Sequence, residues 1–255
     1  MGNMMESLGL TESMKDQSLS GKTILVTGGA SGLGSALCRL LAASGANIAV
    51  GDLPDRASAF AQTLEANGGR IHGMGFDVGD PASAEKAVAD TIKEFGRLDV
   101  LINNAGTDKT LSMGELSTDD WLRVINTNLN GPFLMAKFAS EHMKKAGGGH
   151  IVNIASTAAK RAWPNASAYH ASKWGLLGLS HAMHAELRAE NIRVTAVVVG
   201  GMRTPFLLDR FPDIDESKLQ DPMNVARAVK SALLLPEDSV IAEITVLPLQ
   251  ETSWP

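Results

Sequence analysis

The chain has few of the features that mark secreted, membrane-bound or nucleic-acid-binding proteins. Its 255 residues include a single cysteine, Cys38, which excludes an internal disulfide and suits a reducing compartment such as the cytoplasm. Apolar runs stay shorter than the ~18 residues that a membrane-spanning helix needs. The formal net charge of −5 argues against nonspecific binding to nucleic acid or anionic lipid. No histidine has a cysteine or carboxylate cluster beside it at metal-ligand spacing, so no metal is expected.

Aromatic residues are also scarce, at 5% of the chain, and only one of them is a tyrosine. Tyr169 lies four residues before Lys173, so on a helix the two side chains share a face, with Cβ atoms roughly 5–6 Å apart. A free phenol has a pKa near ~10, and a neighbouring ammonium favours the phenolate. We therefore expect Lys173 to lower the pKa of Tyr169 far enough for proton exchange with an alcohol or a carbonyl. Taken alone, a tyrosine and a lysine at this spacing are more often a pair of surface side chains.

A glycine-rich turn stands near the start of the chain. The run Thr23–Val26 predicts a strand, and residues 32–44 carry apolar side chains at helical period. Gly28, Gly32 and Gly34 lie at the junction. Glycines allow the backbone to approach a pyrophosphate closely, and a helix N-terminus presents unpaired N–H groups to it. We interpret the turn as the phosphate cradle of a dinucleotide site; a glycine turn without a ligand is the alternative.

An acidic residue ends the second predicted strand. Asp52 follows Gly34 by 18 residues, close to the ~20 at which a carboxylate bonds the adenosine ribose hydroxyls. Its charge would repel a 2′-phosphate, which favours NAD(H) over NADP(H). Arg56, four residues further on, would weaken this preference, and a cap on the Leu53-Pro54 turn is the other interpretation of Asp52.

Strands and helices alternate from residue 21 onward. Strands are predicted at 23–26, 47–51, 70–76, 100–103, 150–154, 193–199 and 240–246, and helices at 32–44, 56–67, 81–95, 118–145, 168–188 and 222–235. This order predicts an α/β fold, a doubly wound parallel sheet of Rossmann type with about seven strands and helices on both faces. We expect one dinucleotide-binding catalytic domain over 21–255 and a flexible tail over 1–20.

In this order the motifs resemble those of the short-chain dehydrogenase/reductase family, in its single-domain form with Tyr-x-x-x-Lys. The resemblance runs from about residue 19 to residue 249. The motifs that carry it are Thr27-Gly28 with Gly32-Leu33-Gly34, Asp77-Val78, Asn103-Asn104-Ala105-Gly106, Asn128-Leu129, Ser156, Tyr169 with Lys173, and Gly200 with Thr204. One departure is Val199, which stands where the family usually has proline.

The resemblance implies an NAD(H)-dependent oxidoreductase that transfers a hydride between a nicotinamide cofactor and a secondary alcohol or ketone. It implies that Tyr169 is the general acid/base, that Ser156 donates to the substrate oxygen and that Lys173 binds the nicotinamide ribose. Asn128 would hold a proton-relay water, with Asn126 as the fallback. The implied cofactor-binding residues are Gly28, Ala30, Ser31, Gly32, Leu33, Gly34, Asp52, Leu53, Asp77, Val78, Asn104, Ala105, Gly106, Tyr169, Lys173, Gly200, Met202 and Thr204. It also implies a homodimer or homotetramer.

Several of these positions have a plainer interpretation as well. Asp77 either holds the adenine amino group, as the resemblance implies, or only shapes the turn before a helix. Ser156 is either a substrate contact or a turn cap, and Thr157 is a weaker candidate for the contact. Asn103 we assign to structure and its neighbour Asn104 to the cofactor.

The substrate region is predicted least sharply. Residues 201–221 are irregular and contain two prolines, as expected of a lid over the site. Lys109, Lys160, Arg161 and Arg203 stand close to site motifs, where a guanidinium or ammonium would anchor a carboxylate or phosphate. Ordinary surface charge is the alternative. We expect a small or medium hydroxy or keto compound, with an anionic group as one option.

Other functions remain open on sequence grounds. A noncatalytic NAD(H)-binding sensor or assembly subunit would share the fold, because fold alone does not decide function, but it would not need the proton chemistry of Tyr169 and Lys173. A nucleotide-sugar epimerase or dehydratase would need an added substrate domain. The acidic Asp-Gly-Gly turn typical of acyl-carrier reductases is absent, which disfavours that substrate class.

Overall fold

The computed structural model describes residues 18–66 and 68–251. Its strands form one parallel sheet in the order β3-β2-β1-β4-β5-β6-β7. The strands are β1 Thr23–Thr27, β2 Asn47–Asp52, β3 Ile71–Gly75, β4 Val100–Asn103, β5 Gly149–Ile154, β6 Ile192–Val199 and β7 Glu243–Val246. Successive strands are added toward one edge of the sheet from β1 to β3 and toward the other edge from β4 to β7, so the order switches between β1 and β4. Open α/β sheets bind ligands at the carboxyl ends of the strands beside such a switch point. The predicted fold class is confirmed.

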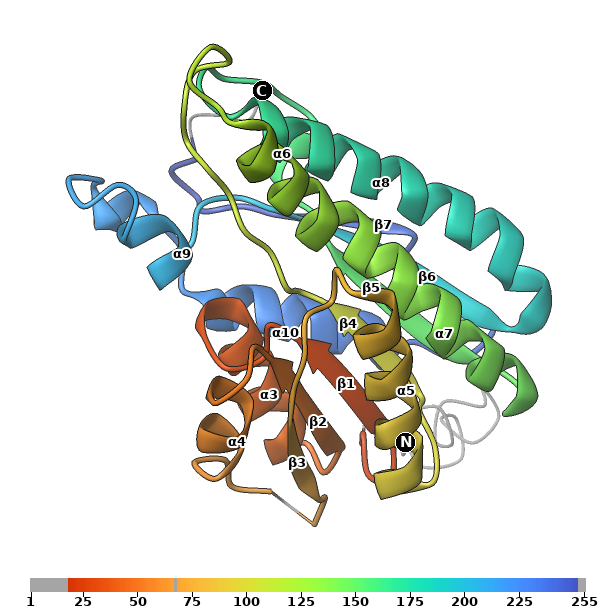
Figure 1. The fold of residues 1–255 in the computed structure, drawn as a ribbon. Helices are drawn as coiled ribbons and strands as arrows, with labels where there is room; N and C mark the ends of the chain where they lie inside the picture. The colour runs from red at the N-terminus through yellow and green to blue at the C-terminus, as the bar shows by residue number, and fades with distance from the viewer. Residues whose placement is uncertain (1–17, 67, 252–255) are drawn as a thin grey trace, which may run out of the picture.

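Helices cover both faces of this sheet (Figure 1). One hydrophobic cluster joins the sheet to α3 (Gly32–Ala43) and α10 (Pro222–Leu233). A second cluster joins it to α5 (Pro81–Phe95), α7 (Gly131–Lys145) and α8 (Ser167–Leu187). Inner strands such as β1 and β6 are buried between these layers, which explains their nearly continuous apolar sequences, whereas the edge strands β3 and β7 are only partly buried. Of the described helices, none combines the length and apolarity needed to cross a membrane.

Helix starts follow the capping residues in the sequence. Asp80 accepts a hydrogen bond from Ser83 N, and Asp221 accepts one from Met223 N, each with proline at the first turn. α4 (Arg56–Ala61) ends earlier than the predicted residue 67, which itself lies outside the described residues. The amide and the hydroxyl of Thr63 both donate to the Phe60 carbonyl, and this local bonding ends the α-helical pattern.

The start of the chain is only partly described. Residues 1–17 of the predicted tail lie outside the described residues. Of the three described residues in that range, Leu19 is buried in the cluster that also holds α3 and α10.

The predicted helix 118–145 is divided into three parts. α6 (Thr118–Ile125) leads into a π-helical segment, Asn126–Asn130, and this leads into α7. Pro132 has no N–H and its ring would clash with the carbonyl of Asn128, one α-helical turn earlier. Widening the helix to π geometry separates the two groups, and such segments often occur at functional sites. The interruption predicted here takes this form.

Residues 201–221 hold more regular structure than predicted. Thr204 and Pro205 begin a short helix, α9 (Pro205–Leu208), and a 3-10 turn follows at Glu216–Lys218. Backbone bonds tie the two ends together: Gln220 N donates to Gly201 O and Arg203 N donates to Gln220 O. The segment therefore projects from the sheet as one closed loop, with α9 at the edge of the molecule (Figure 1).

Candidate active site

A cavity of about 470 Å³ opens at the carboxyl ends of the strands. It is lined by fifteen of the residues predicted to bind cofactor: Gly28, Ser31, Gly32, Leu33, Asp52, Leu53, Asp77, Val78, Asn104, Ala105, Gly106, Tyr169, Lys173, Met202 and Thr204. Ala30, Gly34 and Gly200 lie outside the lining. Of the four predicted catalytic residues, Tyr169 and Lys173 line the cavity. The other two, Asn128 and Ser156, are buried.

The glycine turn has no room for side chains. Gly28 and Gly32 have φ angles of +63° and +50°, which favour glycine. A Cβ at Gly34 would lie 1.9 Å from the Gly28 carbonyl oxygen, and one at Gly28 would lie 2.8 Å from Ala105 Cα. Ser31, the N-cap of α3, makes no side-chain capping bond. The first N–H groups of α3 thus face the turn as a phosphate would require, and the residues fit a dinucleotide.

Asn104 has a structural task that the sequence did not indicate. Its side-chain amide donates to the carbonyl oxygens of Thr27 and Gly28, at 3.0 and 2.9 Å. The Thr27 hydroxyl in turn accepts from the amides of Asn104 and Ala105. Asn104 therefore lines the cavity and also fixes the glycine turn. Asn103 bonds Asn153 within the core, as its structural assignment predicts.

Two backbone N–H groups fix the carboxylate of Asp52 at the end of β2. Its Oδ2 accepts from Ala30 N at 2.9 Å and its Oδ1 from Leu53 N at 2.8 Å. Ala30 therefore acts on the site through Asp52. The carboxylate has about four acceptor positions, so it retains capacity for ribose hydroxyls while also capping the local turn. Arg56 Nη1 lies 3.8 Å from Oδ1.

Asp77 and Val78 shape the cavity next to β3. The Asp77 carboxylate accepts from Gly79 N at 2.8 Å, so the turn interpretation applies, yet the exposed side chain also lines the cavity. Val78 is buried and packs closely on Gly131 of α7. A Cβ built at Gly131 would lie 2.7 Å from Val78 Cγ2.

Gly200 lies behind the cavity wall. A Cβ there would approach Pro248 Cδ to 2.8 Å and Leu247 Cδ2 to 3.1 Å, so this glycine allows the segment after β7 to pack against the end of β6. Its neighbours Val199 and Met202 line the cavity. Thr204 does so too, and its Cβ would lie 3.3 Å from a Cβ built at Gly32.

Ser156, Tyr169 and Lys173 meet where β5 ends against α8. Ser156 Oγ accepts from Ala158 N at 3.1 Å and is also hydrogen-bonded to the Tyr169 phenol. It is thus both the turn cap and a site residue. Lys173 Nζ donates to Ile154 O at 2.8 Å and lies 5.7 Å from the centre of the Tyr169 ring. The three polar groups converge on one corner of the cavity.

The pKa of Tyr169 differs from the sequence prediction. Burial raises the pKa of Tyr169 to about 12, and the charge of Asp108 adds to the rise, against the opposing hydrogen bond from Ser156 and the charge of Arg210. Burial alone lowers the pKa of Lys173 to about 8. The prediction of a lowered tyrosine pKa is wrong for this structure: loss of hydration is the largest cause of the shift, and Lys173 is not among the groups that move the pKa of Tyr169.

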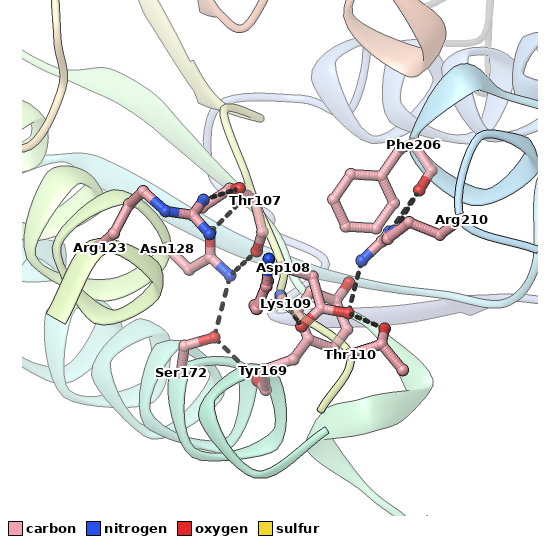
Figure 2. Close-up of polar contacts among 10 residues, drawn as sticks. All are labelled: Thr107, Asp108, Lys109, Thr110, Arg123, Asn128, Tyr169, Ser172, Phe206 and Arg210. Carbon is pink, nitrogen blue, oxygen red and sulfur yellow. Dashed lines mark hydrogen bonds and ion pairs between the residues drawn. The ribbon is translucent and has the colours of Figure 1, made fainter. Parts of the chain in front are cut away.

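Asn128 connects the loop after β4 to the catalytic helix. Its Oδ1 accepts from Thr107 N and its Nδ2 donates to Thr107 O, both at 2.8 Å. Nδ2 also donates to Ser172 Oγ at 3.1 Å (Figure 2). A Cβ at Gly106 would lie 3.6 Å from Asn128 Oδ1 and 3.9 Å from Lys173 Nζ. Both donors of Asn128 Nδ2 and one acceptor position of Oδ1 hold this loop beside Lys173.

Sequence reasoning missed Asp108, Phe206 and Arg210. The Phe206 ring lies 5.9 Å from the Tyr169 ring, and Arg210 pairs with Asp108 at 2.5 Å (Figure 2). The four-residue spacing of Phe206 and Arg210 was the available sign of a helical pair, but the two prolines of this segment argued for irregular structure. Asp108 lies two residues after the Asn103–Gly106 motif and is not part of it.

The cations predicted as anion anchors are placed elsewhere. Lys109, Lys160, Arg161 and Arg203 all lie outside the cavity lining. Lys160 pairs with Glu243 at 2.9 Å, and Arg203 Nη1 donates to the Leu219 carbonyl. Within the described part of the chain, no group of three His, Cys, Asp or Glu side chains is placed to hold a metal ion.

Comparisons with known proteins agree with this geometry. The family model of the short chain dehydrogenases matches residues 22–215. The chain is 42% identical over 183 residues to a D-threitol dehydrogenase of Mycolicibacterium smegmatis, covering 71% of this chain and 70% of that protein. It is 39% identical to a trans-4-hydroxycyclohexanecarboxylate dehydrogenase of Sinomonas cyclohexanicum, over 72% and 73% of the two chains. A solved levodione reductase superposes with a TM-score of 0.83 at 28% identity, over 91% of this chain and 98% of that one.

The family match spans most of the sheet and includes the glycine turn, Ser156 and the Tyr169–Lys173 pair. The catalytic interpretation is the one that these relatives support, and the alternative of a noncatalytic sensor finds no support in them. The chain belongs to the short-chain dehydrogenase/reductase family, oxidoreductases that act on alcohols and ketones with a nicotinamide cofactor.

Proposed function

We propose that this protein oxidises a secondary alcohol or reduces the corresponding ketone, with Tyr169 as the general acid/base. The observation that carries the proposal is the convergence of Tyr169, Ser156 and Lys173 on one corner of the cavity. The bound nicotinamide would supply or accept the hydride. The chain's own side chains then need only hold the substrate oxygen and move its proton.

Each of the three side chains has a distinct task in this proposal. A phenol whose pKa is raised to about 12 is protonated at neutral pH, so Tyr169 is ready to donate to the oxygen of a ketone undergoing reduction. Ser156 has one O–H donor, which in this proposal turns from the Tyr169 phenol to the substrate oxygen and stabilises its developing negative charge. Lys173, fixed by Ile154 O, supplies a positive charge beside the phenol. Asn128 is a positioning residue that acts through Thr107 and Ser172.

The function is tested by a broad panel of secondary alcohols with NAD⁺ and of ketones with NADH, followed by nicotinamide absorbance. Turnover of any secondary alcohol or ketone supports the proposal. A panel that covers open-chain and cyclic compounds without any turnover contradicts it.

We propose NAD(H) as the preferred cofactor and NADP(H) as the weaker one. The support is Asp52, which two backbone N–H groups hold at the cavity wall. Two negative charges about 4 Å apart repel by about 4 kcal/mol at an effective dielectric of ~20, and the ion pair with Arg56 reduces this value. The wild-type protein should therefore bind NADH at least about tenfold more tightly than NADPH.

Asp52→Asn should reduce that ratio by about tenfold or more, because the amide keeps the shape and removes the charge. Fluorescence titration of NADH and NADPH measures both affinities. Asp55→Asn is the matched control: Asp55 precedes α4, its side chain makes no capping bond, and its left-handed backbone is one that asparagine accepts. Equal affinities in the wild type would refute the role of Asp52.

We also propose a homodimer or homotetramer. Large apolar side chains are exposed on helices that pack together: Leu122 on α6, Phe133 on α7 and Trp174 on α8. Trp174 is 52% exposed and Leu122 48%, and such a patch is typical of a protein interface. Sedimentation should show an oligomer that Trp174→Glu weakens. A wild-type monomer at micromolar concentration would contradict this.

We propose a single domain with a lid over the site. Residues 21–255 would form one catalytic domain, with the segment 201–221 as a lid whose Phe206 packs toward Tyr169. The single cysteine favours a cytoplasmic location.

A further inference from the structure

An ion pair lies next to the cavity, between segments that contribute the lining residues Thr107 and Phe206, and the proposed proton transfer does not use it. Asp108 follows β4 in the loop that Asn128 holds, and Arg210 follows α9, 102 residues later. Arg210 Nη1 and Asp108 Oδ2 are 2.5 Å apart, with side-chain exposures of 22% and 7%. Figure 2 shows Arg210 between Asp108 and Phe206, and the Phe206 ring lies 5.9 Å from the Tyr169 ring. Thr107, which precedes Asp108, and Phe206, on which Arg210 stacks, both line the cavity with Tyr169, so the pair stands directly behind the lining next to the Tyr169 ring.

Both members of the pair are held rigidly. The Arg210 guanidinium stacks on the Phe206 ring at 3.8 Å from its centre and donates from Nε and Nη2 to the Phe206 carbonyl. Asp108 accepts from its neighbour Lys109 N at 2.7 Å and from the Thr110 hydroxyl at 3.3 Å. With the segment 201–221 in this conformation these contacts fix both charges, so a substrate in the closed site meets the pair as it stands.

The pair retains hydrogen-bonding capacity of both kinds. An arginine has five N–H donors, and three are engaged with Asp108 and Phe206. A carboxylate has about four acceptor positions, and three are occupied on Asp108. One acceptor position and two donors are left. A hydroxyl group, which donates and accepts, satisfies both at once.

The same pair opposes an anionic substrate. Its net charge is zero, so Arg210 offers no uncompensated positive charge to a carboxylate. A carboxylate bound there would lie beside Asp108, or would have to displace Asp108 and leave it unpaired in a partly enclosed site, which is costly. Of the other cations predicted as anchors, Lys160 is paired with Glu243 and Arg203 donates to the Leu219 carbonyl, so each already has a partner.

We infer that Asp108 and Arg210 form the polar end of the substrate site and select an uncharged substrate with a second hydroxyl or carbonyl oxygen next to the reacting carbon. Short polyols and their hydroxyketones are the class with this chemistry. The inference rests on the proposed function, since it concerns the atoms next to the oxygen that Tyr169 serves. It replaces the anionic option considered from the sequence.

Three four-carbon secondary alcohols provide the first test, because they differ only near the reacting carbon. With saturating NAD⁺, kcat/KM should be about tenfold or more higher for 2,3-butanediol than for 2-butanol, since hydrogen bonds to charged groups are the stronger kind. It should be lowest for 3-hydroxybutyrate, in which a carboxylate replaces the terminal methyl group of 2-butanol. A wild-type preference for 3-hydroxybutyrate over the diol overturns the inference.

Variants of the pair provide the second test. Asp108→Asn removes the compensating charge, so kcat/KM for 3-hydroxybutyrate relative to the diol should rise by about tenfold or more. Adding Arg210→Gln to this variant should abolish the rise, because the uncovered cation is gone. Asp209→Asn, which removes an exposed carboxylate from the same segment, should leave the ratio unchanged. NADH binding by fluorescence verifies that each variant is folded.

The outcomes separate this inference from the proposed function. A shift in Asp108→Asn no larger than that in Asp209→Asn overturns the inference alone, as does turnover of other ketones or alcohols with none of these three. A lack of turnover on every secondary alcohol and ketone overturns the proposed function and the inference with it.

Discussion

Replacing Tyr169 by phenylalanine is expected to lower kcat by about a thousandfold or more while the affinity for NADH stays within about twofold. General acid–base catalysis contributes roughly 10²–10⁴-fold, and this chain has no second tyrosine to substitute. Phenylalanine keeps the ring that packs toward Phe206, so the change removes little besides the hydroxyl. Steady-state kinetics and fluorescence titration of NADH provide the two measurements.

Ser156→Ala is the companion variant. It removes one hydrogen bond to the substrate oxygen and one to Ala158 N, but no proton donor, so its loss of kcat should be clearly smaller than that of Tyr169→Phe. A Tyr169→Phe protein within about tenfold of the wild-type kcat would show that another group transfers the proton.

Lys173→Met is expected to lose most of the activity and to gain stability. Burial lowers the pKa of Lys173 from 10.5 to about 8, which means that folding a charged lysine into this site costs roughly 3 kcal/mol. Methionine has a similar length and no charge, but it forfeits the hydrogen bond to Ile154 O, worth about 1 kcal/mol. The free energy of unfolding at pH 7 should therefore rise by about 2 kcal/mol.

The cost of burying Lys173 depends on pH. Below pH 8 the lysine is charged in both the folded and the unfolded state, and the full cost is present. Between about 8 and 10.5 the unfolded state binds the additional proton, so wild-type stability from this group rises with pH and the advantage of Lys173→Met disappears. Thermal unfolding at pH 7 and pH 10, with exposed Lys145→Met as the control, measures it. A lower Tm for Lys173→Met at pH 7 would contradict the account.

The parts of the fold and site that the sequence predicted are governed by local chemistry. β4 and α5 have the predicted bounds, because the apolar run Val100–Ile102 and the Asp80-Pro81 cap are each complete within a few residues. The glycine turn was predictable for the same reason, since a required positive φ or close approach leaves only glycine at a position such as Gly28 or Gly34.

The parts that were missed depend on contacts between distant segments. The Asp108–Arg210 pair joins residues 102 positions apart, and no spacing rule predicts it. Gly200 appeared in a motif, but whether its backbone faces the cavity or Pro248 is decided by the packing of the chain after β7. The pKa of Tyr169 was predicted with the wrong sign because spacing gives the neighbouring charge but not the loss of water.

The central claim, that Tyr169 carries the transferred proton, is tested most directly by its own ionisation. Because the chain has one tyrosine, the near-ultraviolet absorbance of phenolate reports on Tyr169 alone. In the free protein little phenolate should form by pH 10, since its pKa lies at about 12, whereas an ordinary phenol would be about half ionised.

The decisive comparison uses protein saturated with NAD⁺. The account predicts that kcat for alcohol oxidation rises with pH and that its midpoint coincides with the ionisation of Tyr169 measured in the same complex, because oxidation needs the phenolate as base. A kcat that titrates while the absorbance remains that of a neutral phenol would contradict the account.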